Sequence, residues 1–344
     1  MGPDLATQVV RWQARHGRNQ LPWQNTRDPY RVWLSEIMLQ QTQVVTVLDY
    51  FPRFLHRFPS VQSLAAAHLD DVLALWSGLG YYSRARNLHA CAVQVVSQHG
   101  GEFPGTAQVL QTLPGIGRST AGAIASICFG ERVAILDGNV RRVLTRVLGY
   151  GQDLAQAAHE RALWERATEL LPTRDLQRAM PRYTQGMMDL GATVCLARQP
   201  KCDACPLAQT CVARAQGTPE KYPVKSRKLK RSVQSLWLLW AQTRDGAVWL
   251  SQRPSPGVWA GLFCMDLFDS REALQAAVPA RYRAALQDDD VVKHVLTHKD
   301  LYLHPVRVRL AAGALKRGAG AWFSAGQWPR LGLPAPVRKL LAAA

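Results

Sequence analysis

Long apolar runs are missing from this chain of 344 residues, although 47% of its residues are hydrophobic. No stretch reaches the roughly 18 uninterrupted apolar residues of a membrane helix, so we expect no membrane span. The segment from Met1 to Asn19 alternates apolar and charged residues as an amphipathic helix does. It lacks the apolar stretch and the small-residue cleavage site of a secretory signal, so we expect a cytoplasmic protein.

Acidic residues are also scarce, because 25 Asp and Glu stand against 42 Lys and Arg and leave a net charge of +17. Such a balance favours a polyanionic partner through long-range attraction, and nucleic acid is the first candidate. A merely basic or ribosome-adjacent protein is the alternative, since composition alone does not identify a ligand.

The chain divides into three parts by pattern. Up to residue 214, apolar residues recur at three- and four-residue spacing between short Gly/Pro breaks, which predicts an all-α region. We assign residues 1–215 to this region, residues 216–232 to a linker and residues 233–344 to a small α+β domain. Helices are expected at 29–41, 71–76, 84–98, 120–129, 159–171, 271–278 and 335–341, and strands at 235–240, 247–252 and 301–310.

The linker is strongly basic and contains two prolines. This composition fits either a solvated connector or a segment in direct contact with DNA, and its charges would attract phosphate in both cases. The basic residues are Lys221, Lys225, Arg227, Lys228, Lys230 and Arg231.

Four of the seven cysteines fall within 17 residues in the pattern C-x6-C-x2-C-x5-C. They are Cys195, Cys202, Cys205 and Cys211. Closely spaced thiolates in a chain without a secretory signal indicate a metal site rather than disulfides. Spacing alone leaves zinc and a [4Fe-4S] cluster both open, because each accepts four thiolates. The scattered cysteines, Cys91, Cys128 and Cys264, are expected to be small core residues.

A glycine-rich turn, Leu113-Pro114-Gly115-Ile116-Gly117, stands directly before an apolar helix. Glycines let another molecule approach the backbone closely, and a helix start offers unpaired N–H groups and a positive dipole end. The turn is therefore a candidate phosphate site, although an ordinary connection between two helices would have a similar sequence.

These motifs together resemble the endonuclease III superfamily of helix-hairpin-helix DNA glycosylases. The cysteine loop, with Lys201 and Pro206 beside its second and third cysteines, is similar to the superfamily's [4Fe-4S] loop. The glycine turn is similar to its hairpin, which is followed by an essential aspartate where Asp137 stands. The resemblance implies DNA as the polymer, a [4Fe-4S] cofactor, and backbone contacts by Gly115, Gly117 and Ser119.

The segment from Leu21 to Gln43 resembles the catalytic segment of MutY-type adenine DNA glycosylases. Breaking an N-glycosidic bond needs an acid for the leaving base and an anion for the developing sugar cation. By this resemblance Glu36 protonates N7 of adenine, Asp137 stabilises the oxocarbenium ion, and Asn139 holds these groups in place. Taken alone, Glu36 would be a solvated helix residue and Asp137 a helix N-cap.

Further positions match the same family one by one. Gln41 and Tyr81 match residues that enter the DNA stack around 8-oxoguanine when adenine is flipped out, although Tyr81 could also be a core residue. The residues that match the adenine pocket are Leu21, Trp23, Gln24 and Gln185.

Two departures bear on strand cleavage. Ser119 stands where endonuclease III has the lysine that forms a Schiff base, so a monofunctional glycosylase that leaves an abasic site is expected. Arg141 replaces a lysine of many relatives, and arginine is not a Schiff-base nucleophile. The alternatives are an endonuclease III-like glycosylase/lyase acting on oxidised pyrimidines and a non-catalytic, mismatch-scanning DNA-binding protein.

Residues 233–344 resemble the Nudix-like domain that follows the catalytic region in this family. The acidic Nudix box is absent, so the domain should bind rather than hydrolyse. Leu296, Thr297 and His298 stand where the family usually has Phe-Ser-His, and the resemblance assigns Thr297 and His298 to 8-oxoguanine. We thus expect a monomer, associated with the nucleoid, that binds double-stranded DNA with A·8-oxoguanine or A·G mispairs.

Overall fold

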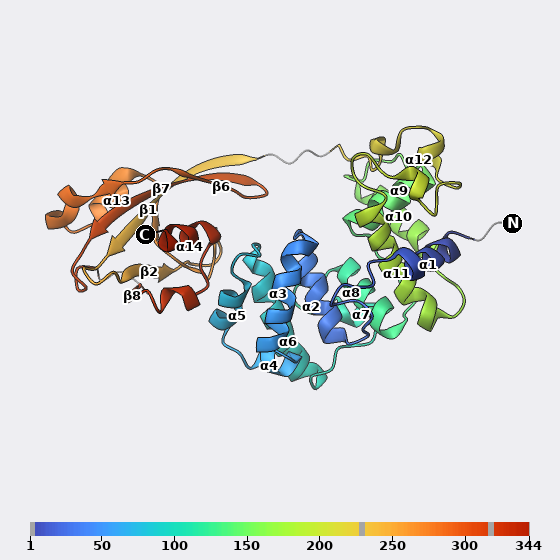
Figure 1. Cartoon of the computed structure of the whole chain (residues 1–344), viewed down its shortest axis with the longest axis horizontal. Helices are drawn as coiled ribbons and strands as arrows, with labels where there is room; N and C mark the ends of the chain where they lie inside the picture. Colours follow the sequence, from blue (N-terminus) through green and yellow to red (C-terminus); the bar gives the residue numbers. More distant parts are fainter. Residues whose placement is uncertain (1–3, 227–230, 316–319, 344) are drawn as a thin grey trace. The chain divides into compact units, whose positions relative to one another are not determined.

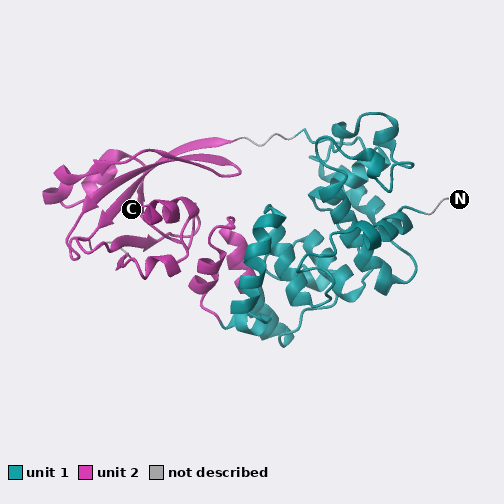
Figure 2. Cartoon of the chain, in the orientation of Figure 1, with its two compact units in different colours: residues 1–66, 90–228 teal, residues 67–89, 229–344 magenta. Residues whose placement is uncertain are grey.

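The computed structural model describes residues 4–226, 231–315 and 320–343 of the chain. These fall into two compact units (Figure 2). Unit 1 comprises residues 1–66 and 90–228, and unit 2 comprises residues 67–89 and 229–344. Unit 2 therefore contains a short helical segment, 67–89, in addition to the domain that the sequence predicts after the linker.

Unit 1 is helical, as predicted from the apolar spacing. One core of this unit packs α1 against α9, α10 and α11 through residues such as Val9, Leu144, Leu163 and Met187, all nearly inaccessible to solvent. The helices of the unit are α1 (Leu5–His16), α2 (Pro29–Leu39), α3 (Val44–Arg57), α4 (Val61–Ala65), α7 (Ala107–Leu110), α8 (Arg118–Ile124), α9 (Gly138–Leu148), α10 (Ala157–Glu169), α11 (Leu176–Thr193) and α12 (Val212–Ala215) (Figure 1).

Two aspartates start the helices that matter most for the site. Asp28 accepts a hydrogen bond from the backbone N–H of Tyr30 at the start of α2, where Pro29 is compatible with the first turn. Asp137 accepts one from the backbone N–H of Val140, at 2.7 Å, at the start of α9. Each cap satisfies a backbone donor that the helix itself leaves unpaired.

The predicted helix at 120–129 is observed with a change of pitch. It is α-helical in α8 and continues as a π-helical turn at Ala125–Phe129, which ends at Gly130 with a φ of +71°. Gly122 lies against the following loop, because a Cβ at this position would come within 2.7 Å of the carbonyl oxygen of Ala134. This close approach brings the loop before Asp137 next to α8.

Unit 2 is built on a mixed sheet whose main strand order is β3-β2-β1-β7-β5. The long strands β1 and β7 pair in parallel, with Leu236 opposite Leu303, while the other pairings are antiparallel. Buried Leu239, Val306 and Leu274 form its core. The strands are β1 (Ser232–Gln242), β2 (Val248–Gln252), β3 (Phe263–Cys264), β4 (Asp266–Phe268), β5 (Gln287–Asp288), β6 (Val292–Val295), β7 (Lys299–Arg309) and β8 (Ala321–Phe323), and the helices are α5 (Leu69–Trp76), α13 (Arg271–Ala277) and α14 (Ala335–Ala342).

The segment 67–89 is attached to this domain by hydrogen bonds to backbone carbonyls. Ser77 and Tyr82 both donate to Leu333, at 3.0 and 2.9 Å, and Arg86 donates to Ala260 at 2.6 Å. Helix α6 (Tyr82–His99) has its first residues in unit 2 and the rest in unit 1.

The first half of the predicted linker packs on unit 1. The backbone N–H of Leu154 donates to the carbonyl of Val224 at 3.0 Å, and the backbone N–H of Ser226 donates to Asp153 at 3.0 Å. Of the basic linker residues, Arg227, Lys228 and Lys230 lie outside the described residues. Within the described part of the chain, no helix is long and apolar enough to span a bilayer.

Candidate active site

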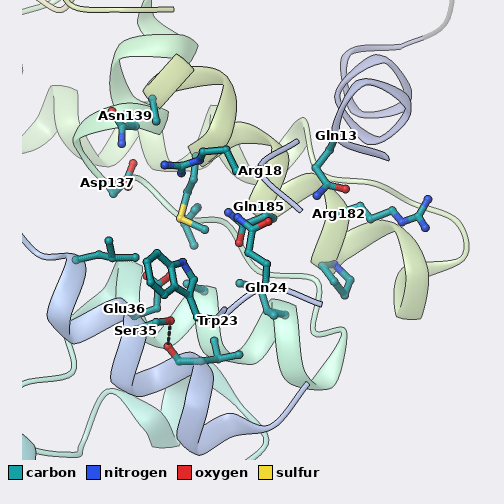
Figure 3. A pocket seen from close by; sticks show the side chains of 18 of the residues that line it. Gln13, Arg18, Trp23, Gln24, Ser35, Glu36, Asp137, Asn139, Arg182 and Gln185 are labelled. Atoms are coloured by element: carbon teal, nitrogen blue, oxygen red, sulfur yellow. Dashed lines mark hydrogen bonds between the residues drawn. The ribbon is translucent and has the colours of Figure 1, made fainter. Parts of the chain in front are cut away.

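Unit 1 contains a cleft of about 1570 Å³ lined by α1, α2, the start of α8, the loop before α9 and α11 (Figure 3). Small-molecule pockets are typically about 300–1,000 Å³, so this cleft has room for part of a polymer. Of the residues matched by resemblance in unit 1, the cleft is lined by Trp23, Gln24, Glu36, Gln41, Ser119, Asp137, Asn139 and Gln185. Leu21 is buried and does not line the cleft.

Glu36 is a half-buried carboxyl on α2, between the fully buried Trp33 and Ile37. Burial raises its pKa to about 7, and the nearby negative charge of Asp137 acts in the same direction. The guanidinium of Arg18 opposes this shift. A carboxyl with such a pKa holds a proton near neutral pH and can still release it, which is what a general acid requires.

Asp137 faces the same cleft from the other side (Figure 3). Burial raises its pKa, while hydrogen bonds from the backbone of Val140 and Asn139 and the positive charges of Arg142 and Arg141 oppose that shift. These donors and charges favour the carboxylate. Asp137 is therefore both the N-cap of α9 and a carboxyl group presented to the cleft, so the two interpretations of this residue do not compete.

Asn139 is held in place by its neighbours. Its side-chain oxygen accepts a hydrogen bond from Arg142 at 2.8 Å, and Arg142 also donates to the backbone carbonyls of Gly191 and Cys195. A Cβ on Gly191 would come within 2.6 Å of the Cβ of Asn139, so glycine is needed for this close contact between α11 and α9.

Trp23 and Gln24 form one wall of the cleft. The ring of Trp23 packs edge-on against Phe51, with centroids 5.5 Å apart. Both side-chain polar atoms of Gln24 are inaccessible to solvent and have no hydrogen-bond partner among the described residues. Buried amides are normally satisfied, so this side chain is suited to a polar ligand in the cleft.

A fully buried aspartate on α11 organises the opposite wall. Asp189 accepts hydrogen bonds from the backbone N–H and the side chain of Arg18, at 3.0 and 2.7 Å, and from the amide of Gln185 at 3.1 Å. Asp189 thereby holds Gln185, which matches the adenine pocket, and Arg18, whose charge opposes the rise in the pKa of Glu36. No sequence motif pointed to Arg18 or Asp189, although the four-residue spacing of Gln185 and Asp189 places them on one helical face.

The two glycines of the hairpin before α8 are exposed. Gly115 has a φ of +75°, which favours glycine, and a Cβ on Gly117 would meet no atom within 4 Å. Space outside the backbone is thus open to a large ligand. The hydroxyl of Ser119 accepts a hydrogen bond from the backbone N–H of Leu136, at 3.0 Å, and so helps to hold the loop that carries Asp137.

All four closely spaced cysteines line one small cavity beside α9. Among the described residues, no three Cys, His, Asp or Glu side chains converge closely enough for a single metal ion. A zinc ion would need four sulfur atoms about 2.3 Å from one centre. Four thiols around one cavity also match the donor set of a [4Fe-4S] cluster, in which each cysteine binds a separate iron atom.

Arg146 supplies a positive charge to this cysteine loop. Its side chain is nearly inaccessible to solvent and lies 3.4 Å from Sγ of Cys195. It also donates to the carbonyls of Leu196 and Pro219, at 2.6 and 2.7 Å. A guanidinium held here suits a site that gathers negative thiolates.

In unit 2 the structure brings Tyr81 and Thr297 together, because their hydroxyl groups are hydrogen-bonded. Tyr81 has a φ of +48° and is 41% exposed, so it is not a core residue. Thr297 is half-buried and His298 is exposed, in a turn whose carbonyls accept hydrogen bonds from Arg231. Gln41, which lies in unit 1, also has a left-handed backbone conformation, with a φ of +55°.

Comparison with known proteins bears on these observations. A family model described as HhH-GPD superfamily base excision DNA repair protein matches residues 34–169, and a NUDIX domain model matches residues 237–343. An adenine DNA glycosylase of Buchnera aphidicola subsp. Acyrthosiphon pisum (strain APS) is 36% identical over 97% of this chain and 95% of that protein. An adenine DNA glycosylase of Mus musculus is 46% identical over 60% of this chain and 41% of the mouse protein.

Two solved structures resemble the helical part. A thermostable thymine-DNA glycosylase matches with a TM-score of 0.53 and 26% identity over 61% of this chain and 95% of that chain. Endonuclease III in a non-covalent complex with DNA matches with a TM-score of 0.51 and 21% identity over 62% of this chain and 94% of that chain. At this identity the second match supports the fold alone. The predicted fold class, a helix-hairpin-helix region followed by a Nudix-like domain, is thereby confirmed.

Proposed function

Because the chain belongs to the adenine DNA glycosylase family of base excision repair, we propose that it removes adenine paired with 8-oxoguanine or guanine in double-stranded DNA. The observation that carries the proposal is the pairing of Glu36, whose pKa is about 7, with Asp137 in one cleft. One carboxyl is suited to donate a proton and the other to remain an anion.

The chemistry follows from these two groups. Glu36 donates its proton to N7 of adenine, and the bond between N9 and the sugar C1′ breaks with its electron pair leaving on the base. The negative charge of Asp137 stabilises the oxocarbenium ion that remains. Glu36, now ionised, accepts a proton from the water that attacks C1′, so that the products are free adenine and an abasic site.

Separate groups would recognise the two bases of the mispair. The unpartnered amide of Gln24 and the amide of Gln185 are suited to the polar edge of a flipped adenine, with Trp23 as an apolar wall. Tyr81 and Gln41 would enter the stack around 8-oxoguanine, and Thr297 with His298 would contact the lesion. We propose that the protein binds its DNA as a monomer.

We further propose that Cys195, Cys202, Cys205 and Cys211 hold a [4Fe-4S] cluster. This group would order the cysteine loop next to α9, the helix that Asp137 caps. Iron and acid-labile sulfide in equal amounts in the purified protein would support the assignment, whereas zinc without sulfide would contradict it.

A glycosylase assay tests the function directly. Duplexes containing A·8-oxoguanine, A·G or thymine glycol are each treated with the protein and analysed with and without alkali. We expect cleavage only of the two adenine-containing duplexes, and only after alkali. Activity on thymine glycol would favour an endonuclease III-like enzyme, and no excision from any duplex would favour a non-catalytic scanning protein.

The rate of adenine excision should depend on pH through Glu36. Since the reaction needs protonated Glu36, the single-turnover rate should fall above about pH 7. The charge of Asp137 helps to raise this pKa, so the residual activity of Asp137→Asn should begin to fall at a lower pH than wild type. Superimposable alkaline limbs in the two proteins would contradict the assignment of Glu36 as the acid.

Ser119→Lys should introduce strand cleavage. The side chain lines the cleft from the first turn of α8, so a lysine amine there could attack the sugar C1′ and form a Schiff base. We expect borohydride to trap the variant on abasic DNA far more strongly than wild type, with Ser119→Arg as the control that carries charge without a nucleophile. Strong trapping of the wild type would mean that another amine reacts.

A further inference from the structure

Helix α11 directs a row of polar side chains into the cleft. Arg178, Arg182 and Gln185 all line it, and Asp189, about one turn further along the helix, accepts a hydrogen bond from Gln185. The spacings of four, three and four residues place these side chains on one helical face. The helix therefore presents two arginines, then an amide matched to the base pocket, then a buried anchor.

The two arginines differ from the other cationic residues of the cleft. Arg18 pairs with Asp189, Arg27 is bound to Gln177, and Arg142 donates to Asn139 and backbone carbonyls. Among the described residues, the guanidinium groups of Arg178 and Arg182 form neither a hydrogen bond nor an ion pair, and both residues are exposed. In Figure 3 the guanidinium of Arg182 points away from Glu36.

We propose that Arg178 and Arg182 form a phosphate clamp that holds the DNA strand whose nucleotide enters the cleft. This inference rests on the proposed function only in taking DNA as the ligand. The two side chains start about 6 Å apart along the helix axis, and their reach lets each contact a different phosphate. Unpaired arginines suit this role, because binding a phosphate then breaks no existing ion pair.

The phosphate clamp and the hairpin contribute to the cleft from different helices. Ser119 and Thr120, next to the hairpin glycines, line the cleft from α8, whereas the arginines line it from α11. A strand entering the cleft would thus be held from both elements, with its base directed toward Gln185, one helical turn beyond Arg182. We expect Arg178 and Arg182 to contact phosphate only when a nucleotide lies in the cleft. Their contribution to DNA binding therefore differs from the long-range attraction between a basic protein and any DNA.

The test measures DNA affinity against salt concentration with the full chain. The probe is a labelled duplex with a tetrahydrofuran abasic-site analogue opposite 8-oxoguanine, which offers no base to excise, and an undamaged duplex is run in parallel. The double variant Arg178→Gln/Arg182→Gln is compared with wild type. The matched control is Arg161→Gln/Arg174→Gln, since both residues are exposed and outside the cleft lining.

Each phosphate contact contributes about 0.9 to the slope of log affinity against log salt. On the abasic duplex we expect the clamp variant to lose about 1.8 from this slope, so that between about 50 and 200 mM salt wild type loses affinity roughly tenfold more than the variant. The control variant should keep the wild-type slope. The charge-conserving variant Arg178→Lys/Arg182→Lys should also keep it, which separates loss of charge from misfolding.

An unchanged slope in the clamp variant would overturn the proposal, as would an equal loss on the undamaged duplex or in the control variant. The outcome is independent of the base assignment. If wild type fails to excise adenine but the slope difference persists, the clamp stands and the proposed function falls. If adenine is excised and the slope does not change, the proposed function is supported and the phosphate clamp is not.

Discussion

Glu36→Gln should lower the single-turnover rate of adenine excision by about 10²–10⁴, the usual contribution of a general acid. Glutamine has nearly the shape of glutamate, but it has no proton to give to the departing base. DNA affinity should change little, because the role proposed for this residue is at the reacting atoms and not at the DNA backbone. Quenched-flow excision on an A·8-oxoguanine duplex, with affinity measured on the abasic duplex, separates these quantities.

Folding is a second readout for this variant. The folded protein raises the pKa of Glu36 to about 7, so ionisation of this carboxyl weakens the fold as pH rises toward and through that value. Glutamine removes this dependence, and the variant should be at least as stable as wild type above pH 7. A stable Glu36→Gln protein with near-wild-type excision would remove Glu36 from the mechanism.

Asp137→Asn should lower excision by about 10²–10³, because it removes an anion that stabilises the developing sugar cation. Asparagine is as good an N-cap as aspartate, so the start of α9 should remain intact. We therefore expect a thermal unfolding midpoint close to that of wild type together with a large loss of rate. This combination would assign the effect to charge rather than to helix capping.

Asp137→Ala provides the contrast. It removes both the charge and the hydrogen bond to the backbone of Val140, so it should also lose about 1 kcal/mol of folding stability. If Asp137→Asn excises adenine as fast as wild type while Asp137→Ala loses stability, the aspartate has only its capping role.

The elements of the fold were largely predictable from local pattern. The apolar spacing of residues 159–171 and the Val- and Leu-rich stretch 301–310 correspond to α10 and β7. The π-helical turn after Ile124 was not predicted, because it depends on how the helical segment that begins with α8 ends at Gly130. The assignment of residues 67–89 to unit 2 could not be predicted either, since it depends on contacts with Ala260 and Leu333 that span 174 and 256 positions.

The residues of the site that belong to a sequence motif could be predicted. Those that are positioned by contacts between distant segments could not. Glu36 and Asp137 lie in one cleft as the resemblance implies, while their roles stay predictions until the variants are measured. The hydrogen bonds that join Asp189 to Arg18 span 171 positions, so no local pattern predicts them. The pKa of Glu36 has the same origin, because its burial and the charges beside it come from separate segments.

The three cysteines outside the cysteine loop bear on the resistance of the protein to oxidation. Burial raises the pKa of Cys91, Cys128 and Cys264 to about 12, so each stays a protonated thiol at any physiological pH. Oxidants attack the thiolate, and these side chains are neither ionised nor accessible. These three sulfur atoms therefore stay unreactive toward oxidants for as long as the protein remains folded.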